Sequence, residues 1–353
     1  MAEKINGRVA YADLLRSLAI LGTILHRLAL GGLESAAAGG HAWQVFNLFA
    51  GLTRWCFPVF IMLSGMFLLD KRALPLTKLF FHNLLRLWAA LMVWGGIYAV
   101  VGYVTAGGRF SWWGLWQAIL AALRGNTHSH LWPIYIFMGL YLIAPILRAF
   151  CRGASRGDLH YFLLLCFLFA SLLPLAFRLW PNSTAVLKVW YDRLEVQLVM
   201  GYVGYFVAGH YLREYLISRL AEALIYVLGI LGAIVTVWGT AALSLGGTSQ
   251  PLYGYTTPNV ACFSVAIVVL FRYVLGVSEE RSRRQRLSGV ARVAFGIYLV
   301  HEFFFMLLRF LHISVFSLPP VASVPLLTAV VFLLSFAVAW LISKLPFLGW
   351  LLT

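Results

Sequence analysis

The stretch "YADLLRSLAILGTILHRLAL", residues 11–30, decides the fold class of this chain. Its leucines, isoleucines and alanines run for about 20 residues, the length that a helix needs to cross a bilayer. The same stretch carries Asp13, Arg16, His26 and Arg27. Ionisable side chains inside a membrane span are costly without partners or water, so each of them marks a candidate functional position.

The whole chain shares this apolar character. Of its 353 residues 62% are hydrophobic and 11% are charged, and the mean hydropathy is +0.87. Soluble domains carry about 25% charged residues. The composition therefore predicts an all-α, polytopic membrane protein, with residues 1–353 forming a single membrane domain and no appended soluble domain.

Apolar runs of membrane length predict about ten transmembrane helices. They lie near residues 12–33, 45–69, 79–105, 131–148, 159–180, 197–213, 221–245, 258–277, 290–311 and 322–344.

The formal net charge of +15 comes largely from connections between these spans. Lys and Arg gather in the connections that follow the even-numbered spans, whereas the opposite connections hold few of them. Cytoplasmic loops carry such an excess, so both termini are expected in the cytoplasm and no nucleic-acid partner is implied. The four cysteines show no paired spacing, and neither a disulfide framework nor a metal site is expected.

Arginines outnumber acidic residues within the apolar runs. Arg16 and Arg86, near the cytoplasmic ends of the first and third spans, are suited to an anionic ligand such as a phosphate, which a guanidinium binds with two parallel hydrogen bonds. Arg54 lies about ten residues into the second span and is expected to pair with a carbonyl or carboxylate inside the bundle.

His26 lies roughly 15 Å along the helix axis from Arg16, at about 1.5 Å rise per residue. This position is near the middle of the bilayer. A neutral imidazole there can act as a general base that takes a proton from a hydroxyl group. The alternative is a histidine that only hydrogen-bonds to a neighbouring helix, and the sequence does not separate the two.

Further candidates for a cavity or acceptor site lie later in the chain. His130 and Trp132 are expected on the outer face, and Glu302 beside His301 is a candidate to orient an imidazole or compensate an arginine. The loop "GGTSQPLYGYTTPN" at residues 246–259 has no charge and offers tyrosines for stacking on a sugar, or it is an ordinary interfacial turn.

Several segments together resemble the acyltransferase 3 family of multi-spanning membrane acyltransferases, which includes bacterial O-acetyltransferases of surface polysaccharides. The segments, in chain order and over nearly the whole chain, are "YADLLRSLAIL" followed by a mid-helix His, "CFPVFIMLSGMFLLDKR" (56–72), "HLWPIYIFMGLYLIAPILR" (130–148) and "FGIYLVHEFFFML" (295–307).

The resemblance implies an enzyme in the bacterial inner membrane. It would move an acyl group, commonly acetyl, from cytoplasmic acyl-coenzyme A to a hydroxyl of a glycan or lipid-linked glycan. By this resemblance His26 is the catalytic base, Arg16 its partner in the first helix, and Arg86 part of a donor-binding arginine motif. Acyl-coenzyme A serves as the donor, without a metal.

Two positions depart from the family pattern. Nine residues separate Arg16 from His26 instead of ten, which sets them about 80° apart around a helix and gives Arg27 the family's histidine register. Either a tightened turn near Gly22 and Thr23 returns His26 to the cavity, or Arg27 faces it. In the third span, Asn83 replaces the first arginine of the family's Arg-x-x-Arg.

Two other functions fit a polar site among membrane helices. One is a transporter or flippase of an anionic or lipid-linked saccharide, although the inverted repeats common in transporters are not evident. The other is a catalytically inactive relative of the family, since a shared fold does not guarantee a shared activity.

Overall fold

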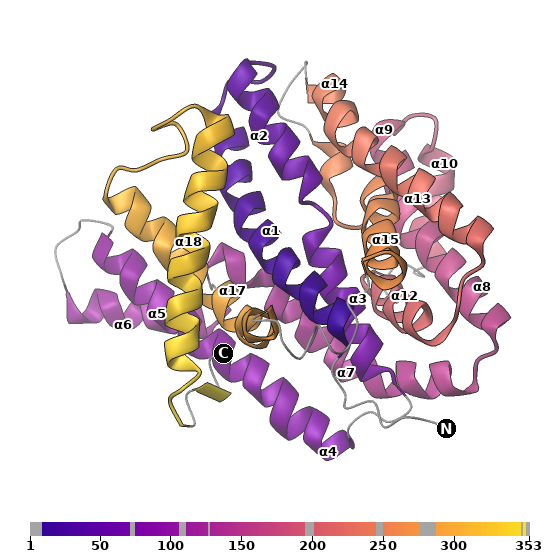
Figure 1. Ribbon diagram of the computed structural model, residues 1–353, viewed down its shortest axis with the longest axis horizontal. Helices are drawn as coiled ribbons and strands as arrows, with labels where there is room; N and C mark the ends of the chain where they lie inside the picture. Colours follow the sequence, from indigo (N-terminus) through magenta and orange to yellow (C-terminus); the bar gives the residue numbers. More distant parts are fainter. Residues whose placement is uncertain are drawn as a thin grey trace. The chain divides into compact units, whose positions relative to one another are not determined.

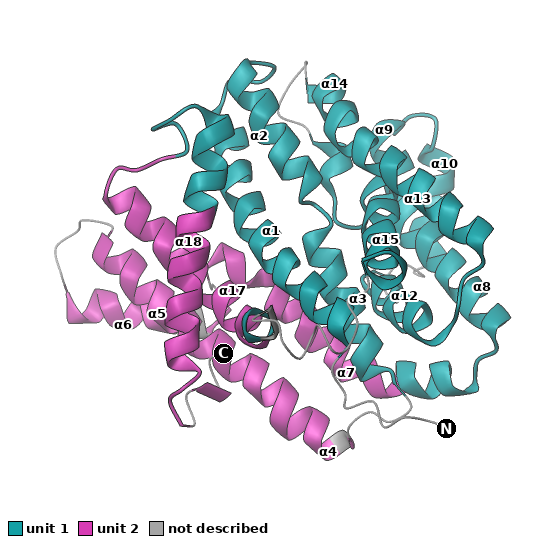
Figure 2. Ribbon diagram, in the orientation of Figure 1, with its two compact units in different colours: residues 1–71, 147–291, 315–328 teal, residues 72–146, 292–314, 329–353 magenta. Residues whose placement is uncertain are grey.

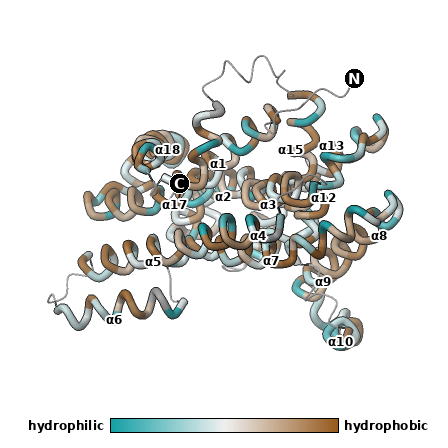
Figure 3. Tube along the Cα trace, turned by 90° about the horizontal axis from the view of Figure 1, so that it is seen from below, coloured by the Kyte–Doolittle hydropathy of each residue, from teal (hydrophilic) through white to brown (hydrophobic). Residues whose placement is uncertain are grey.

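The computed structural model describes residues 9–70, 75–105, 111–125, 128–194, 201–244, 250–275, 287–346 and 349–350, and within these residues the regular structure is entirely helical. Figure 1 shows the helices along the chain, and Figure 3 shows that hydrophobic residues dominate most of them. The all-α fold class is therefore confirmed.

The helices of the first half of the chain are α1 (Ala10–Ser35), α2 (His41–Leu52), α3 (Cys56–Leu68), α4 (Leu76–Lys78), the π-helical turn η1 (Leu79–Leu84), α5 (Leu85–Thr105), α6 (Trp112–Leu123), the 3₁₀ turn η2 (Ser129–Leu131), α7 (Trp132–Gly153) and α8 (Arg156–Phe167). The second half has the π-helical turn η3 (Leu168–Leu172), α9 (Leu173–Leu179), α10 (Ala185–Leu194), α12 (Val203–Glu214), α13 (Arg219–Ile234), the π-helical turn η4 (Val235–Gly239), α14 (Thr240–Ser244), the 3₁₀ turn η5 (Pro251–Tyr253), α15 (Pro258–Tyr273), α17 (Leu287–Phe310) and α18 (Pro320–Ile342).

The chain divides into two compact units, which Figure 2 colours separately. Unit 1 comprises residues 1–71, 147–291 and 315–328. Unit 2 comprises residues 72–146, 292–314 and 329–353. His26 and Arg16 belong to unit 1, and Arg86 belongs to unit 2.

Eight helical segments of the described chain are long and apolar enough to cross a membrane. They span residues 10–35, 41–68, 79–105, 129–153, 156–179, 219–244, 251–273 and 320–342. The other two expected spans, 197–213 and 290–311, correspond to α12 and α17, which are not among the eight; residues 195–200 lie outside the described residues. The total of ten spans and the cytoplasmic termini stay predictions.

The second span is broken between α2 and α3, and Pro58 explains the break. Proline has no backbone N–H, so Pro58 cannot donate to the carbonyl of Arg54 four residues earlier, as a continuous helix requires. Residues 53–55 form a turn instead, in which the Arg54 N–H donates to the Gly51 carbonyl. The Ala50 carbonyl, its regular helical partner, becomes available to side chains.

α3 and α12 pack with their backbones in contact, and two glycines make this possible. A Cβ atom placed on Gly65 would lie 1.8 Å from the Phe206 carbonyl oxygen, and one on Gly209 would lie 2.0 Å from the Met62 carbonyl oxygen. Small residues permit such close approach between membrane helices. This packing fixes the position of α3 and of the turn that precedes it.

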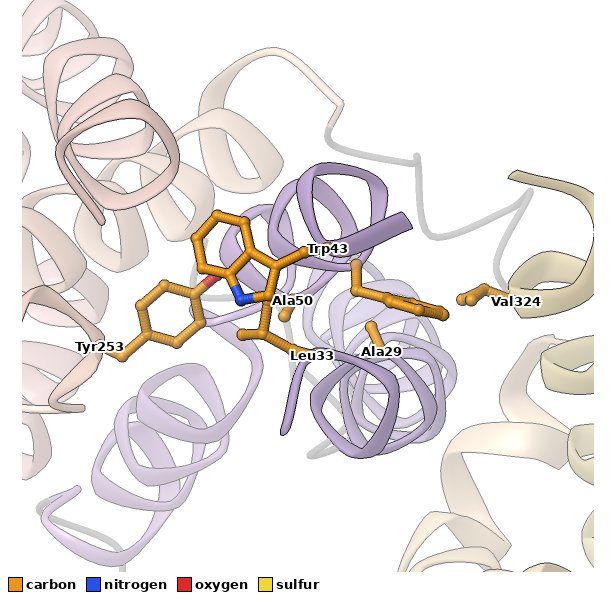
Figure 4. Packing of buried hydrophobic residues seen from close by; sticks show 7 residues of the cluster. Ala29, Leu33, Trp43, Ala50, Tyr253 and Val324 are labelled. Atoms are coloured by element: carbon orange, nitrogen blue, oxygen red, sulfur yellow. The ribbon is translucent and has the colours of Figure 1, made fainter. Parts of the chain in front are cut away.

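A buried cluster holds the end of α1 against α2, η5 and the start of α18. Its residues are Ala29, Leu33, Trp43, Phe46, Ala50, Tyr253 and Val324 (Figure 4). The Tyr253 hydroxyl donates to Asn47 Oδ1 at 2.6 Å, and Asn47 Nδ2 donates to the Val237 carbonyl at 2.9 Å. The fully buried amide of Asn47 is thereby hydrogen-bonded on both sides, and the loop with Tyr253 is anchored beside α2.

Candidate active site

His26 lies on α1 at the break in the second span, and only 4% of it is exposed. Its Nδ1 is 3.0 Å from the Ala50 carbonyl oxygen. A carbonyl can only accept a hydrogen bond, so Nδ1 carries the proton. Nε2 of the neutral ring is then the atom with the free electron pair, and it is the nitrogen able to take a proton.

Arg54, in the turn between α2 and α3, contacts this second nitrogen. Its Nη1 lies 2.7 Å from His26 Nε2, and its Nε donates to the Tyr253 carbonyl. A guanidinium can only donate, which agrees with an unprotonated Nε2. The expectation that Arg54 pairs with a carbonyl inside the bundle is confirmed, whereas its contact with His26 was not expected.

Two tyrosines of the uncharged loop pack on the Arg54 guanidinium. Its central carbon lies 3.9 Å from the ring centre of Tyr255 and 5.3 Å from that of Tyr253, both within cation–π range. The Tyr255 carbonyl accepts a hydrogen bond from Tyr205 at 2.6 Å. The sequence leaves open whether this loop stacks on a sugar or is an ordinary interfacial turn, and the structure shows two of its tyrosines against an arginine. The run of tyrosines without charge was the only signal for this contact.

The structure resolves which residue of α1 faces the interior of unit 1. α1 is an uninterrupted α-helix from Ala10 to Ser35, so the tightened turn considered near Gly22 and Thr23 is absent. His26 is nevertheless buried and hydrogen-bonded, while Arg27 is half-buried. The short Arg–His spacing therefore does not prevent His26 from pointing into unit 1. The break in the second span lies against the side of α1 on which His26 is placed.

Arg16 lies on the same helix but is not brought into contact with His26. Its Nη1 is 3.3 Å from Asp13 Oδ1, one turn away, and its guanidinium carbon is 6.0 Å from the ring centre of Phe67. The side chain is 30% exposed. This arginine is accessible to an anion, and Asp13 already balances part of its charge.

Arg86 lies on α5 in unit 2. Its guanidinium carbon is 5.5 Å from the ring centre of Phe295, and its buried Nε has no hydrogen-bond partner among the described residues. A guanidinium left with an unused donor can bind an acceptor oxygen of a ligand.

Unit 2 also gathers the later candidates into one cluster. His128 Nδ1 and His130 Nδ1 are 2.8 Å apart, so one of these nitrogens donates to the other. The rings of His130 and His301 meet edge to face with centres 5.6 Å apart. Glu302, 1% exposed, accepts a hydrogen bond from Arg309 Nη2 at 3.2 Å.

Glu302 was expected to orient an imidazole or to compensate an arginine. The second part is confirmed, because its carboxylate pairs with Arg309. His128 Nε2 lies 4.0 Å from Glu302 Oε1. Trp132 begins α7 and is half-buried. The contact between His128 and His130 was not expected, and their closeness in sequence was the only signal for it.

The arrangement around His26 is suited to proton transfer and to charge stabilisation. The Nδ1 contact leaves Nε2 unprotonated, and a guanidinium held by a carbonyl and two aromatic rings lies directly beside it. Within the described residues, no group of three or more His, Cys, Asp or Glu side chains is arranged to hold a metal ion.

Comparison with known families gives one match. The model of a family described as an acyltransferase domain, acyltransferase 3, matches residues 9–344. No curated protein and no solved structure matches the chain.

Proposed function

This chain belongs to the acyltransferase 3 family, and we propose that it transfers an acyl group, acetyl in the first instance, from acyl-coenzyme A to a hydroxyl of a glycan or glycolipid. The family match and the apolar helices make it a multi-pass membrane protein of an acyltransferase family. The donor, the acceptor, the base and a location in a bacterial inner membrane are parts of the proposal.

The observation that carries the proposal is the 3.0 Å contact between His26 Nδ1 and the Ala50 carbonyl oxygen, from which the tautomer follows. With Nδ1 donating to the Ala50 carbonyl, Nε2 is the proton acceptor of a positioned general base. In the proposed reaction the acceptor hydroxyl displaces the Arg54 guanidinium from Nε2 and gives its proton to that nitrogen. The hydroxyl oxygen then attacks the thioester carbonyl carbon.

Arg54 would act in the same step. A guanidinium released from Nε2 remains tethered through Nε to the Tyr253 carbonyl, and its Nη1 can donate to the oxyanion that forms on the thioester oxygen. Collapse of this intermediate breaks the carbon–sulfur bond. The thiolate of coenzyme A takes the proton back from His26, which leaves the ester and free coenzyme A.

The donor phosphates would be bound by arginines. Arg16 in unit 1, through its half-buried side chain, and Arg86 in unit 2, through its unused Nε donor, are separate candidates to contact phosphate oxygens. Arg27, half-buried beside His26, is proposed as a lesser contact.

The acceptor is proposed to meet aromatic and imidazole side chains. Trp132, His130, His301 and Glu302 combine apolar rings with hydrogen-bonding groups, as sites for hydroxyl-rich compounds do. Their role is distinct from that of His26 and is testable separately.

The test uses the full chain in lipid nanodiscs with radiolabelled acetyl-coenzyme A and glycans extracted from the producing strain. We expect label in the glycan fraction, and a loss of about 10²–10⁴-fold in rate in His26→Ala. Size-exclusion profiles of both proteins control for folding. Mass spectrometry of surface glycans from the producing and deletion strains identifies the acceptor.

Other outcomes decide between the alternatives. Movement of a lipid-linked saccharide across the bilayer without label transfer would favour a transporter or flippase. Label transfer that persists unchanged in His26→Ala would remove His26 from the mechanism. No transfer to any extracted glycan, with donor binding intact, would indicate an inactive relative.

A further inference from the structure

An apolar cavity of about 280 Å³ lies in unit 1 among α8, η3, α12 and α15. Figure 1 labels α8, α12 and α15, and Figure 2 shows these three helices in unit 1. Nearly all the atoms that line it are apolar. A buried water needs two to four polar partners, whereas a dry apolar cavity of about 150 Å³ can already bind a benzene-sized molecule. The natural occupant of this cavity is therefore a hydrocarbon.

The sequence creates the cavity with small residues and a widened helical turn. Ala170 and Ala208 line it and leave space where larger side chains would fill it. Pro174 has no N–H to donate to the Ala170 carbonyl, and the chain runs as the π-helical turn η3 directly before it.

The cavity is continuous with the exposed apolar surface of α8. Phe167 lines the cavity and is itself 36% exposed, and Leu164 on the same helix is 62% exposed. In a membrane-spanning helix such residues face the acyl chains of lipids. A lipid chain can therefore enter the cavity from the bilayer.

One end of the cavity is polar and cationic. Tyr211, which lines it, has a hydroxyl 3.0 Å from Arg156 Nε, which donates to it, and 2.6 Å from His160 Nε2. Arg156 Nη2 also donates to the Leu216 carbonyl at 3.2 Å. Both Arg156 and His160 are exposed. These bonds hold the guanidinium at the end of the cavity while leaving it accessible.

The charge of Arg156 is not balanced by a carboxylate in the described part of the chain. The nearest acid in sequence, Asp158, accepts a hydrogen bond from the Ser155 backbone N–H in the capping box of α8. A guanidinium matches the oxygens of a phosphate group. The end of the cavity thus has a positive charge where an anionic headgroup would lie.

The geometry points to a binding site for an anionic phospholipid, with its phosphate at Arg156 and His160 and one acyl chain in the cavity. This site includes no residue of the proposed acyl-transfer reaction, so the lipid site and the proposed enzyme activity can fail independently. Tyr211 positions the cation and separates the headgroup from the apolar part.

A second cavity provides the comparison. It measures about 510 Å³ and lies among α2, α13, η4 and α15. Neither cavity has Lys, Arg or His among its lining residues, but the tyrosine that lines the second one, Tyr226, donates to the Glu222 carboxylate at 3.0 Å, whereas Tyr211 accepts from an arginine. The second cavity can take hydrocarbon but offers no charged group to a phosphate. Only the first cavity is expected to distinguish anionic from zwitterionic lipids.

The test measures binding of phosphatidylglycerol and phosphatidylcholine with identical chains to the full-length protein by native mass spectrometry. We expect tighter binding of phosphatidylglycerol. Arg156→Gln should lower the affinity for this lipid alone by about fivefold, which is the effect of one cation near a membrane surface. Arg193→Gln, an exposed arginine on α10 that does not line the cavity, is the matched control. Ala208→Phe fills the cavity and should weaken both lipids, with Ala233→Phe in the second cavity as its control.

Equal binding of the two lipids by the unaltered protein would overturn the assignment. So would equal effects of Arg156→Gln and Arg193→Gln, or of Ala208→Phe and Ala233→Phe. Ala170→Leu fills the same cavity from η3 and replaces Ala208→Phe if that variant does not fold. Acyl transfer, measured on the same samples, reports separately on the proposed enzyme.

Discussion

Arg54 Nη1 lies 2.7 Å from Nε2 of His26, although the two residues are 28 positions apart and belong to different helical segments. The contact occupies the one nitrogen that can accept a proton, because Nδ1 is already bonded to the Ala50 carbonyl. In the resting protein the proposed base is therefore covered by a cation, and an incoming hydroxyl has to displace that cation before it can react.

Arg54 is proposed to cover His26 Nε2 in the resting protein and to donate to the oxyanion during the reaction, and replacing it tests the second role. Arg54→Gln should lower kcat by about 10²–10³-fold, because the donor to the developing oxyanion is lost. Steady-state kinetics with acetyl-coenzyme A in nanodiscs measure this. Arg54→Lys keeps a cation but loses the hydrogen bond from Nε to the Tyr253 carbonyl. Its kcat should lie between those of the unaltered enzyme and Arg54→Gln. A kcat unchanged in Arg54→Gln would contradict an oxyanion role.

Pro58 is predicted to act at a distance through the break in the second span. Pro58→Ala restores a donor to the Arg54 carbonyl and favours a continuous helix, in which the Ala50 carbonyl is bonded by backbone. The His26 ring would lose its fixed tautomer. We expect a lower kcat for Pro58→Ala, with little change in KM for the donor. Pro325→Ala, at a proline inside α18, is the control. Equal kinetics of Pro58→Ala and the unaltered enzyme would argue against this role.

Gly65 should tolerate no side chain. A Cβ atom there would overlap the Phe206 carbonyl oxygen, so Gly65→Ala must push α3 and α12 apart. Overpacking of this kind costs about 1–3 kcal/mol or more. Thermal unfolding in detergent measures the loss. Gly96→Ala on α5 is the matched control, because nothing lies within 4 Å of a Cβ atom at that position. Similar midpoints for both variants would contradict backbone contact between α3 and α12.

Tyr253 should contribute to stability through its hydroxyl group. Tyr253→Phe removes the donor to Asn47 Oδ1 and leaves a fully buried amide oxygen without that bond. A buried polar group that loses its partner costs about 1–3 kcal/mol. The free energy of unfolding measures this loss, and the double variant Tyr253→Phe/Asn47→Leu should recover part of it. A single variant as stable as the parent would show that this hydrogen bond contributes little.

The sequence by itself determined the fold class, the family and the identity of the polar residues. Apolar runs of helix length can be recognised without tertiary contacts because the bilayer imposes their length. The same reasoning marked His26, Arg16, Arg54 and Arg86, since ionisable groups in such runs stand out by composition alone.

Only the tertiary structure decided what His26 contacts. The Arg–His spacing in α1 left open whether His26 or Arg27 faces inward, because helical register gives an angle around one axis but not the position of the neighbouring chain. Pro58 breaks the neighbouring span and frees a carbonyl that meets His26. The loop tyrosines then hold Arg54 beside Nε2 of His26, although Tyr253 is 199 positions away from Arg54 in the chain. Contacts over such distances along the chain depend on packing between helices, which no local pattern encodes.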